Sequence, residues 1–147
     1  MADIAALEAD YYKAIENYEK VAKSSLNNNL MKWSVKEYYL KAGICHLATN
    51  VCFQNYWYLI DCILIYSQDM VGTARAIQSY QELDPTFAAT RECQLLGDLS
   101  NAVEQGDQEA YADKLYQFDQ MSKLDKWKTT LLLRVKDAIE NKEEDFS

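Results

Sequence analysis

The sequence predicts an all-α protein made of stacked antiparallel helical hairpins. Its 147 residues include one proline and four glycines, so residues that break helices are scarce. Apolar residues make up 49% of the chain, which is enough to build a sizeable core. Apolar side chains also recur every three or four residues over most of the length, as in helices that bury one face.

The first predicted helix covers residues 3–23. Its apolar side chains fall on one face of a helix, and they are Ile4, Leu7, Tyr11, Ala14, Tyr18 and Val21. The polar run 24–29 should end this helix. A second helix is expected from Ser34 to Ala48, because Ser34 and Glu37 have the spacing of a capping box at its start.

The third predicted helix spans residues 69–83 and ends at Asp84-Pro85. Asp84 is a suitable N-cap and Pro85 a suitable first residue for a fourth helix. We expect this fourth helix to be continuous as far as Gly106. Its apolar side chains are Phe87, Leu95, Leu96, Leu99 and Val103.

Gly106 and Asp107 should stop the fourth helix and cap the fifth. The apolar side chains of the fifth helix are Tyr111, Leu115 and Phe118. The last helix is predicted from Asp125 to Glu140, where the apolar side chains at four-residue intervals are Trp127, Leu131, Val135 and Ile139. Residues 141–147 are then expected to form an acidic flexible tail.

Two stretches of the chain share a helical pattern. Ala14 and Ala76 each stand four residues before a tyrosine, which is Tyr18 in one copy and Tyr80 in the other. A small residue lets a helix approach its neighbour, and the tyrosine fills the adjoining space. This pattern resembles the second helix of a tetratricopeptide repeat (TPR), so we expect a TPR-like α-solenoid.

Residues 51–68 differ in composition from the rest, since they are largely apolar and carry one charged residue, Asp61. A membrane span needs roughly 20 apolar residues, but this stretch is shorter, is interrupted by polar side chains and lacks basic flanks. A buried helix or strand native to the fold is a second interpretation. The third, which we favour, is an insertion produced by a translated intron.

The intron interpretation rests on reverse translation. Val51-Cys52 can be encoded by GTA-TGT and Gln68 by CAG, which are common first and last codons of a short intron. The segment is a whole number of codons, so its removal would join Asn50 to Asp69 in frame. Whatever its origin, such an apolar insert must find cover, because an exposed apolar patch favours aggregation.

Charge and composition exclude several classes of function. The net charge of −8, with its acidic excess in residues 69–147, gives no general attraction for nucleic acid and suits a basic partner. There is no glycine-rich phosphate loop, nucleophile motif or cluster of metal ligands, so neither an enzyme nor a cofactor is expected. The four cysteines include no C-x-x-C pair, which favours a cytosolic protein with reduced thiols.

Three runs of the chain resemble one protein family. The similarity is to the C-terminal half of alpha-SNAP, called Sec17 in fungi, and it covers residues 13–49, 69–96 and 122–146. These runs most resemble fungal members of the family. The Leu124–Trp127 and Leu131–Arg134 runs, followed by the acidic end, make the likeness specific. Together the three runs cover almost everything outside residues 51–68.

The resemblance implies an adaptor without catalysis. Members of the family are curved sheets of helical hairpins closed by a C-terminal helical bundle. They wrap the four-helix bundle of syntaxin-type SNAREs and recruit the hexameric N-ethylmaleimide-sensitive fusion ATPase, which they stimulate to take the bundle apart. The implied location is cytoplasmic, with peripheral association through SNAREs at Golgi, ER, vacuole and vesicle membranes, in intracellular protein transport and membrane fusion.

Matching positions give a short set of expected contact residues. Those expected to bind SNAREs are Lys36, Asp69 and Glu104. Those expected to bind the ATPase are Glu143, Glu144, Asp145 and Phe146. Family members carry further acidic residues where this chain has Asn101 and Gln105, so its acidic cluster is thinner, and Phe146 stands where animal members carry leucine.

The chain is also about half the length of the family members it resembles. We therefore expect an N-terminally truncated chain that binds SNAREs more weakly while still recognising the ATPase. Two alternatives remain open at this point. One is a generic TPR-like protein-interaction scaffold, and the other is a non-functional or inhibitory truncated isoform.

Overall fold

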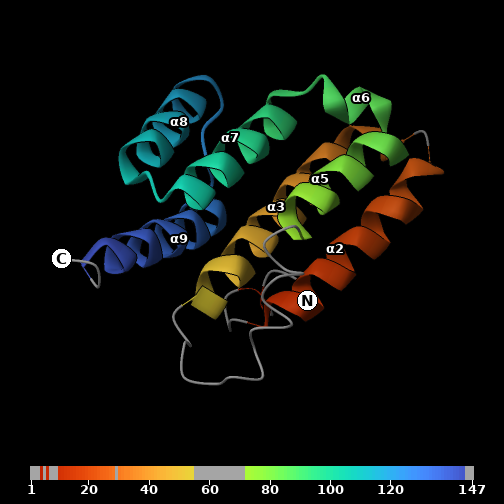
Figure 1. Cartoon of the computed structure of the whole chain (residues 1–147). Helices are drawn as coiled ribbons and strands as arrows, with labels where there is room; N and C mark the ends of the chain where they lie inside the picture. The colour runs from red at the N-terminus through yellow and green to blue at the C-terminus, as the bar shows by residue number, and fades with distance from the viewer. Residues whose placement is uncertain (1–3, 5, 7–9, 29, 55–71, 145–147) are drawn as a thin grey trace.

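The computed structural model describes residues 4, 6, 10–28, 30–54 and 72–144. All regular elements of these residues are α-helices, in agreement with the predicted all-α class (Figure 1). The helices are α2 (Tyr11–Leu26), α3 (Lys32–Gln54), α5 (Gly72–Leu83), α6 (Pro85–Ala88), α7 (Arg91–Gln105), α8 (Gln108–Met121) and α9 (Lys126–Glu144).

Helix α3 lies at the centre of the molecule, in contact with α2, α5, α7 and α9. Helices α2 and α3 form one hairpin, and α7 and α8 form another at the opposite side of Figure 1. The single turn α6 links α5 to α7, and α9 packs against both α3 and α8. The expected stacking of helical hairpins is therefore confirmed, and the three C-terminal helices pack as a group on α3.

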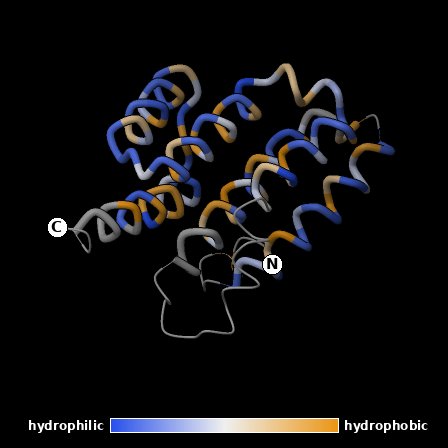
Figure 2. The backbone as a smooth tube through the Cα atoms, in the orientation of Figure 1, coloured by the Kyte–Doolittle hydropathy of each residue, from blue (hydrophilic) through white to orange (hydrophobic). Residues whose placement is uncertain are grey.

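The central position of α3 explains its unusual composition. A helix with neighbours on several sides is apolar around its circumference, whereas a surface helix has one apolar stripe. Figure 2 shows this contrast, because hydrophobic positions recur along α3 while α8 is largely hydrophilic. The buried side chains of α3 include Val35, Tyr39, Leu40, Ala42, Ile44, Cys45, Leu47 and Ala48.

One glycine lets α3 and α7 approach each other closely. A Cβ atom on Gly43 of α3 would lie 2.5 Å from Cδ1 and 2.7 Å from Cδ2 of Leu96 on α7. Leu96 is completely buried, so it has little room to move away. The contact between the central helix and the C-terminal group thus depends on the absence of a side chain at this position.

The alanines and tyrosines of the repeated pattern face neighbouring helices, as predicted. Ala14 is fully buried, Tyr18 is buried beside it, and Tyr80 is buried in the second copy while Ala76 is partly buried. The ring of Tyr80 stacks on that of Tyr39, with 4.7 Å between centroids and 21° between planes. These aromatic rings fill the space between α3 and its neighbours.

Two expectations about helix starts are wrong. The helix predicted over 3–23 is broken at Asp10, whose backbone is not helical. The Asp10 side chain accepts a hydrogen bond from the Lys13 N–H, so Asp10 caps the start of α2. Helix α3 begins at Lys32, and the Ser34 N–H already donates to the Met31 carbonyl. Ser34 therefore has no free N–H for Glu37 to satisfy, and no capping box forms.

The predicted fourth helix is in fact two helices. Thr90 adopts an extended backbone, and its hydroxyl accepts from the Cys93 N–H and donates to the Phe87 carbonyl, which ends α6 and starts α7. A threonine side chain that bonds to nearby backbone competes with a continuous helix. The N-caps at Asp84 and Asp107 are confirmed, since each accepts a backbone N–H.

Two helices continue beyond their predicted ends. Helix α3 runs to Gln54, so residues 51–54 of the apolar segment are helical, while 55–68 lie outside the described residues. Helix α9 runs to Glu144, and so includes the first four residues of the expected tail. Among the helices that the structure describes, none combines the length and the apolar character required to cross a membrane.

Candidate protein-binding surface

The loop before α3 presents an apolar side chain to solvent. The Asn28 side chain accepts a hydrogen bond from the Leu30 N–H at 3.1 Å, and the Met31 N–H donates to the Asn28 carbonyl at 3.0 Å. This turn leaves Leu30 90% exposed. Sequence reasoning missed Leu30, although an apolar residue directly after three asparagines was a signal that could have found it.

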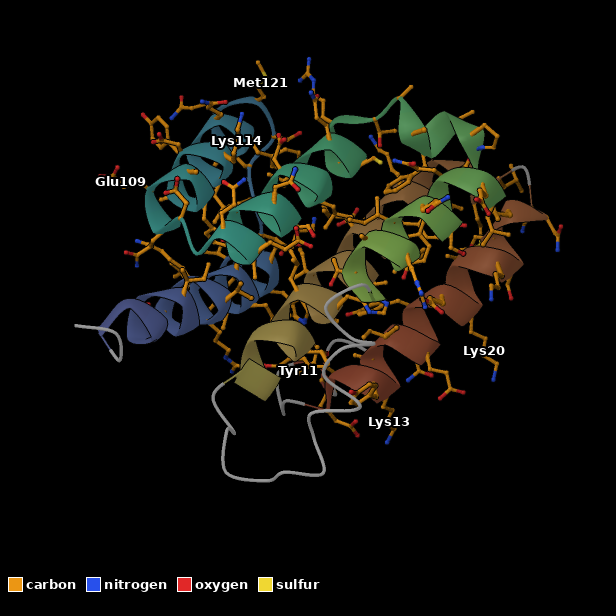
Figure 3. The ribbon with its side chains drawn as sticks, in the orientation of Figure 1. Tyr11, Lys13, Lys20, Glu109, Lys114 and Met121 are labelled. Carbon is orange, nitrogen blue, oxygen red and sulfur yellow. The ribbon has the colours of Figure 1, made fainter. Side chains whose placement is uncertain are left out.

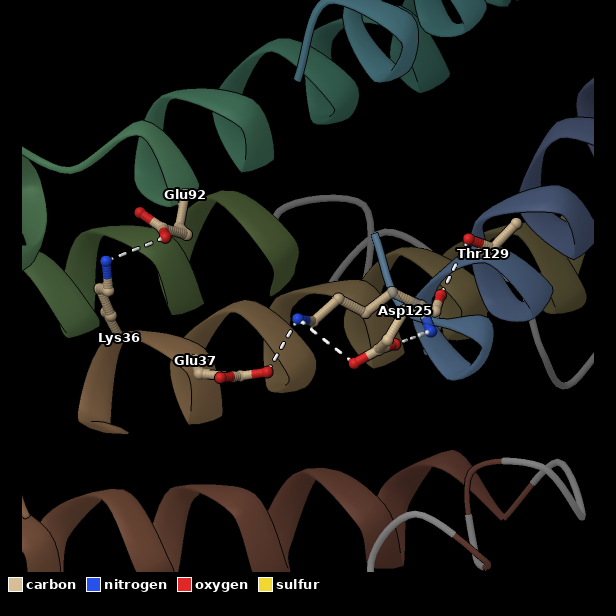
Figure 4. A network of polar contacts seen from close by, with 6 residues as sticks. Lys36, Glu37, Glu92, Asp125 and Thr129 are labelled. Carbon is tan, nitrogen blue, oxygen red and sulfur yellow. Dashed lines mark hydrogen bonds and ion pairs between the residues drawn. The ribbon is translucent and has the colours of Figure 1, made fainter. Parts of the chain in front are cut away.

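Lys36, a predicted SNARE-binding residue, lies near the start of α3 and reaches across to α7. Its Nζ is 3.3 Å from Oε1 of Glu92, and its side chain is 48% exposed whereas that of Glu92 is 16% exposed (Figure 4). The ammonium group is therefore oriented by α7 but remains accessible to a partner. Glu92 was not singled out by the sequence, because its link to Lys36 depends on the packing of α3 against α7.

A second ion pair lies beside the first. Lys128, almost wholly buried near the start of α9, places its Nζ 2.8 Å from Oε1 of Glu37 and 3.5 Å from Oδ2 of Asp125 (Figure 4). Asp125 also accepts the Lys128 N–H at 2.8 Å and so caps α9. We call Lys36, Glu37, Glu92, Asp125 and Lys128 the charged junction; it joins α3, α7 and α9 around a surface pocket of 320 Å³.

Glu104, the second predicted SNARE-binding residue within the described chain, is not part of this junction. It is exposed near the C-terminal end of α7, whereas Glu92 is in the first turn. Twelve residues of helix separate the two, which is about 18 Å along the axis. Lys36 of α3 is paired with Glu92 and so lies beside the start of α7, whereas Glu104 lies near its end. A partner that contacts both must be extended.

The structure describes only two of the remaining predicted binding residues. Asp69, Asp145 and Phe146 lie outside the described residues. Glu143 and Glu144 are the last residues of α9. The start of the same helix is attached to α3 by Lys128.

A third polar cluster joins α2, α3 and α5. The Tyr80 hydroxyl donates to Oε1 of Glu19 at 2.6 Å, and Nε2 of His46 lies 3.6 Å from the same oxygen. The imidazole of His46 is the main cause that lowers the pKa of Glu19 below its ordinary value, against the opposing effect of burial, and the Tyr80 hydroxyl adds to the lowering. Burial, reinforced by Glu19, raises the pKa of Tyr80. This cluster therefore links the three helices.

A family model matches most of the chain. It describes the "Soluble NSF attachment protein, SNAP" and matches residues 1–57 and 50–140. The two matched pieces overlap at residues 50–57, and the second piece spans the apolar segment that was predicted to be an insertion.

Individual relatives agree with this match. The "probable vesicular-fusion protein sec17 homolog" of Schizosaccharomyces pombe is 44% identical over 146 residues, which is 99% of this chain and 44% of the relative. The "alpha-soluble NSF attachment protein" of Vitis vinifera is 45% identical over 97% of this chain and 43% of its own length. The human protein of that name is 37% identical over 99% of this chain. The chain thus spans less than half the length of these relatives.

Proposed function

The chain belongs to the soluble NSF attachment protein family, and from this we propose that it is an adaptor that binds assembled SNARE complexes and recruits their disassembly ATPase. The match to the family model over both halves of the chain is the observation that carries the proposal. The names of its relatives, which refer to vesicular fusion and to attachment of NSF, point to the same role.

The surface at the start of α3 suits such a partner. Lys36 offers a half-exposed cation, and Leu30, six residues earlier, offers an exposed apolar side chain. A SNARE bundle is a long rod of helices with charged faces, so it can meet separated positions such as Lys36 and Glu104 at once. We place SNARE contact on α3 and α7, and ATPase contact at the acidic end of α9.

Several finer features belong to the same proposal. We propose that the partners are syntaxin-type SNARE bundles and the hexameric N-ethylmaleimide-sensitive fusion ATPase. The chain itself then performs no catalysis, and it reaches Golgi, ER, vacuole and vesicle membranes from the cytoplasm through the SNAREs that it binds. The ion pair between Lys128 and Glu37 supports this arrangement, because it fixes α9 on the helix that carries Lys36.

Retention of the chain on immobilised SNARE bundles tests the first half of the proposal. We expect binding to the assembled bundle and little to a single unassembled SNARE. Lys36→Gln should weaken retention several-fold, because it removes the accessible charge but keeps a long polar side chain. Lys20→Gln is a matched control, since Lys20 is an exposed lysine on α2 that points away from the other helices (Figure 3). Equal retention of both variants would contradict the role given to Lys36, and no retention of the unaltered chain would argue for a generic helical scaffold.

Residues 51–68 are a separate part of the proposal. We propose that they are an insertion relative to the family. The family model matches the chain in two pieces rather than one, and the second piece begins at residue 50, next to the start of this segment. Sequencing the mature transcript tests whether it is a translated intron. A message that joins the codons of Asn50 and Asp69 supports an intron, and a message that keeps the intervening codons refutes it.

A further inference from the structure

A groove of 620 Å³ lies between α7 and α8. Leu95 of α7 with Phe118 and Met121 of α8 provides its apolar side chains. Met121 is 70% exposed, and it projects from the end of α8 (Figure 3). Tyr116, which also lines the groove, is 66% exposed, whereas Leu95 is buried at its base. Exposed apolar side chains that gather beside a hollow, rather than singly, are typical of a binding surface.

The charges around this groove are arranged unevenly. Asp98 and Lys114 pair across one end, with 3.9 Å between Oδ2 and Nζ. At the other end lies Arg91, the first residue of α7, and past Phe118 the groove adjoins the pocket that contains Lys123. Among the described residues neither Arg91 nor Lys123 has a carboxylate within ion-pair distance, although the chain as a whole carries a charge of −8.

We propose that the α7–α8 groove binds a short acidic segment of a partner protein. One apolar side chain of that segment packs on Leu95, Phe118 and Met121, and a carboxylate lies between Arg91 and Lys123. Charge complementarity favours this occupant, because two unpaired cations at one end of an apolar surface attract a carboxylate and repel a basic side chain.

The size of the groove limits the segment that fits. From Arg91 to Asp98 the α7 wall is seven residues long, or about 10 Å. That is about two turns of a bound helix or three residues of an extended strand. A single apolar anchor with one or two neighbouring acidic residues therefore fills it, and the bridge between Asp98 and Lys114 marks its end.

Fluorescence anisotropy with the full chain tests this inference. The probe is a labelled helical peptide of alanine, leucine and glutamate, and its counterpart has lysine in place of every glutamate. We expect the glutamate peptide to bind at least tenfold more tightly, and rising salt to weaken it. Arg91→Glu and Lys123→Glu should each weaken it about tenfold. Lys20→Glu, the same charge reversal on α2, should not.

Three results would overturn the inference. They are equal affinity for the two peptides, unchanged affinity in both groove variants, and an equal loss in Lys20→Glu. A fourth is tighter binding of a peptide of residues 141–147 together with dimers of the chain in sedimentation, which would assign the groove to a second copy. The adaptor proposal is tested separately, by SNARE retention of the unaltered chain and of Lys36→Gln, so failure of the groove inference leaves it untouched.

Discussion

Nζ of Lys128 in α9 lies 2.8 Å from Oε1 of Glu37 in α3, across 91 residues of sequence. The lysine side chain is 11% exposed, whereas the glutamate side chain is 51% exposed. The two partners of this ion pair therefore depend on each other unequally. The carboxylate can be solvated without the lysine, but the buried ammonium cannot be solvated without the carboxylate.

This asymmetry predicts that the two halves of the pair differ in their effect on stability. Glu37→Ala should lower the free energy of unfolding by about 1–3 kcal/mol, because it leaves a buried cation with Asp125 as its remaining, more distant partner. Lys128→Met should change it by less than about 1 kcal/mol, because its partners are half exposed. Urea denaturation measures both, and the reverse ranking would contradict the predicted asymmetry.

Two glycines in helix interiors should respond oppositely to alanine. Gly43→Ala should destabilise the protein by about 1–3 kcal/mol, because the new Cβ would clash with the buried Leu96 side chain. Gly97→Ala on α7 should stabilise it by about 0.5–1 kcal/mol, since nothing lies within 4 Å of its Cβ position and alanine is the better helix former. Thermal and urea unfolding check this pair, and stabilisation by Gly43→Ala would show that the two helices can separate freely.

Two buried tyrosines form another matched pair. The Tyr111 hydroxyl donates to the Leu132 carbonyl at 3.0 Å and so links α8 to α9. Tyr111→Phe should therefore cost about 0.5–1.5 kcal/mol of stability. The hydroxyl of Tyr39 is buried without a hydrogen-bond partner among the described residues, so Tyr39→Phe should cost nothing measurable. Similar losses in urea denaturation for both variants would contradict this difference.

Much of the fold could be predicted because helix signals are local. The spacing of apolar residues located the helices, and the side chains of Asp84 and Asp107 located two of the starts. The same reasoning failed at Thr90 and Ser34, where the outcome depends on which backbone group a hydroxyl or N–H meets in the folded chain. Local pattern fixes the type of element more firmly than its ends.

The candidate site was less predictable, since it depends on contacts between distant segments. Lys36 was identified from the family resemblance, but its orientation by Glu92 requires the packing of α3 on α7. The link between Lys128 and Glu37 has no local sequence signal, because Lys128 lies among residues that read as ordinary surface charge. Leu30, in contrast, could have been predicted from local sequence, because its exposure follows from a short polar turn that the sequence does show.

Protonation of Glu19 should lower the free energy of unfolding in acid. Its pKa is lowered in the folded state, chiefly by His46, from an ordinary value of 4.5. Its stabilising contribution is therefore present above pH 4.5 and is lost as the pH falls through the lowered value. Glu19→Gln should be less stable than the parent at neutral pH, and the gap should narrow below pH 4.5. A gap that stays constant in urea denaturation across this range would contradict the assignment.

The adaptor proposal is tested most directly by a three-component assembly. A fluorescent SNARE bundle and the ATPase, held in a non-hydrolysing nucleotide, are passed through a sizing column with and without the chain. We predict that the ATPase co-elutes with the bundle when the chain is present, and that neutralising Glu143 and Glu144 abolishes this while the chain still binds the bundle. Separate elution of the bundle and the ATPase in the presence of the unaltered chain would contradict the claim that this protein joins them.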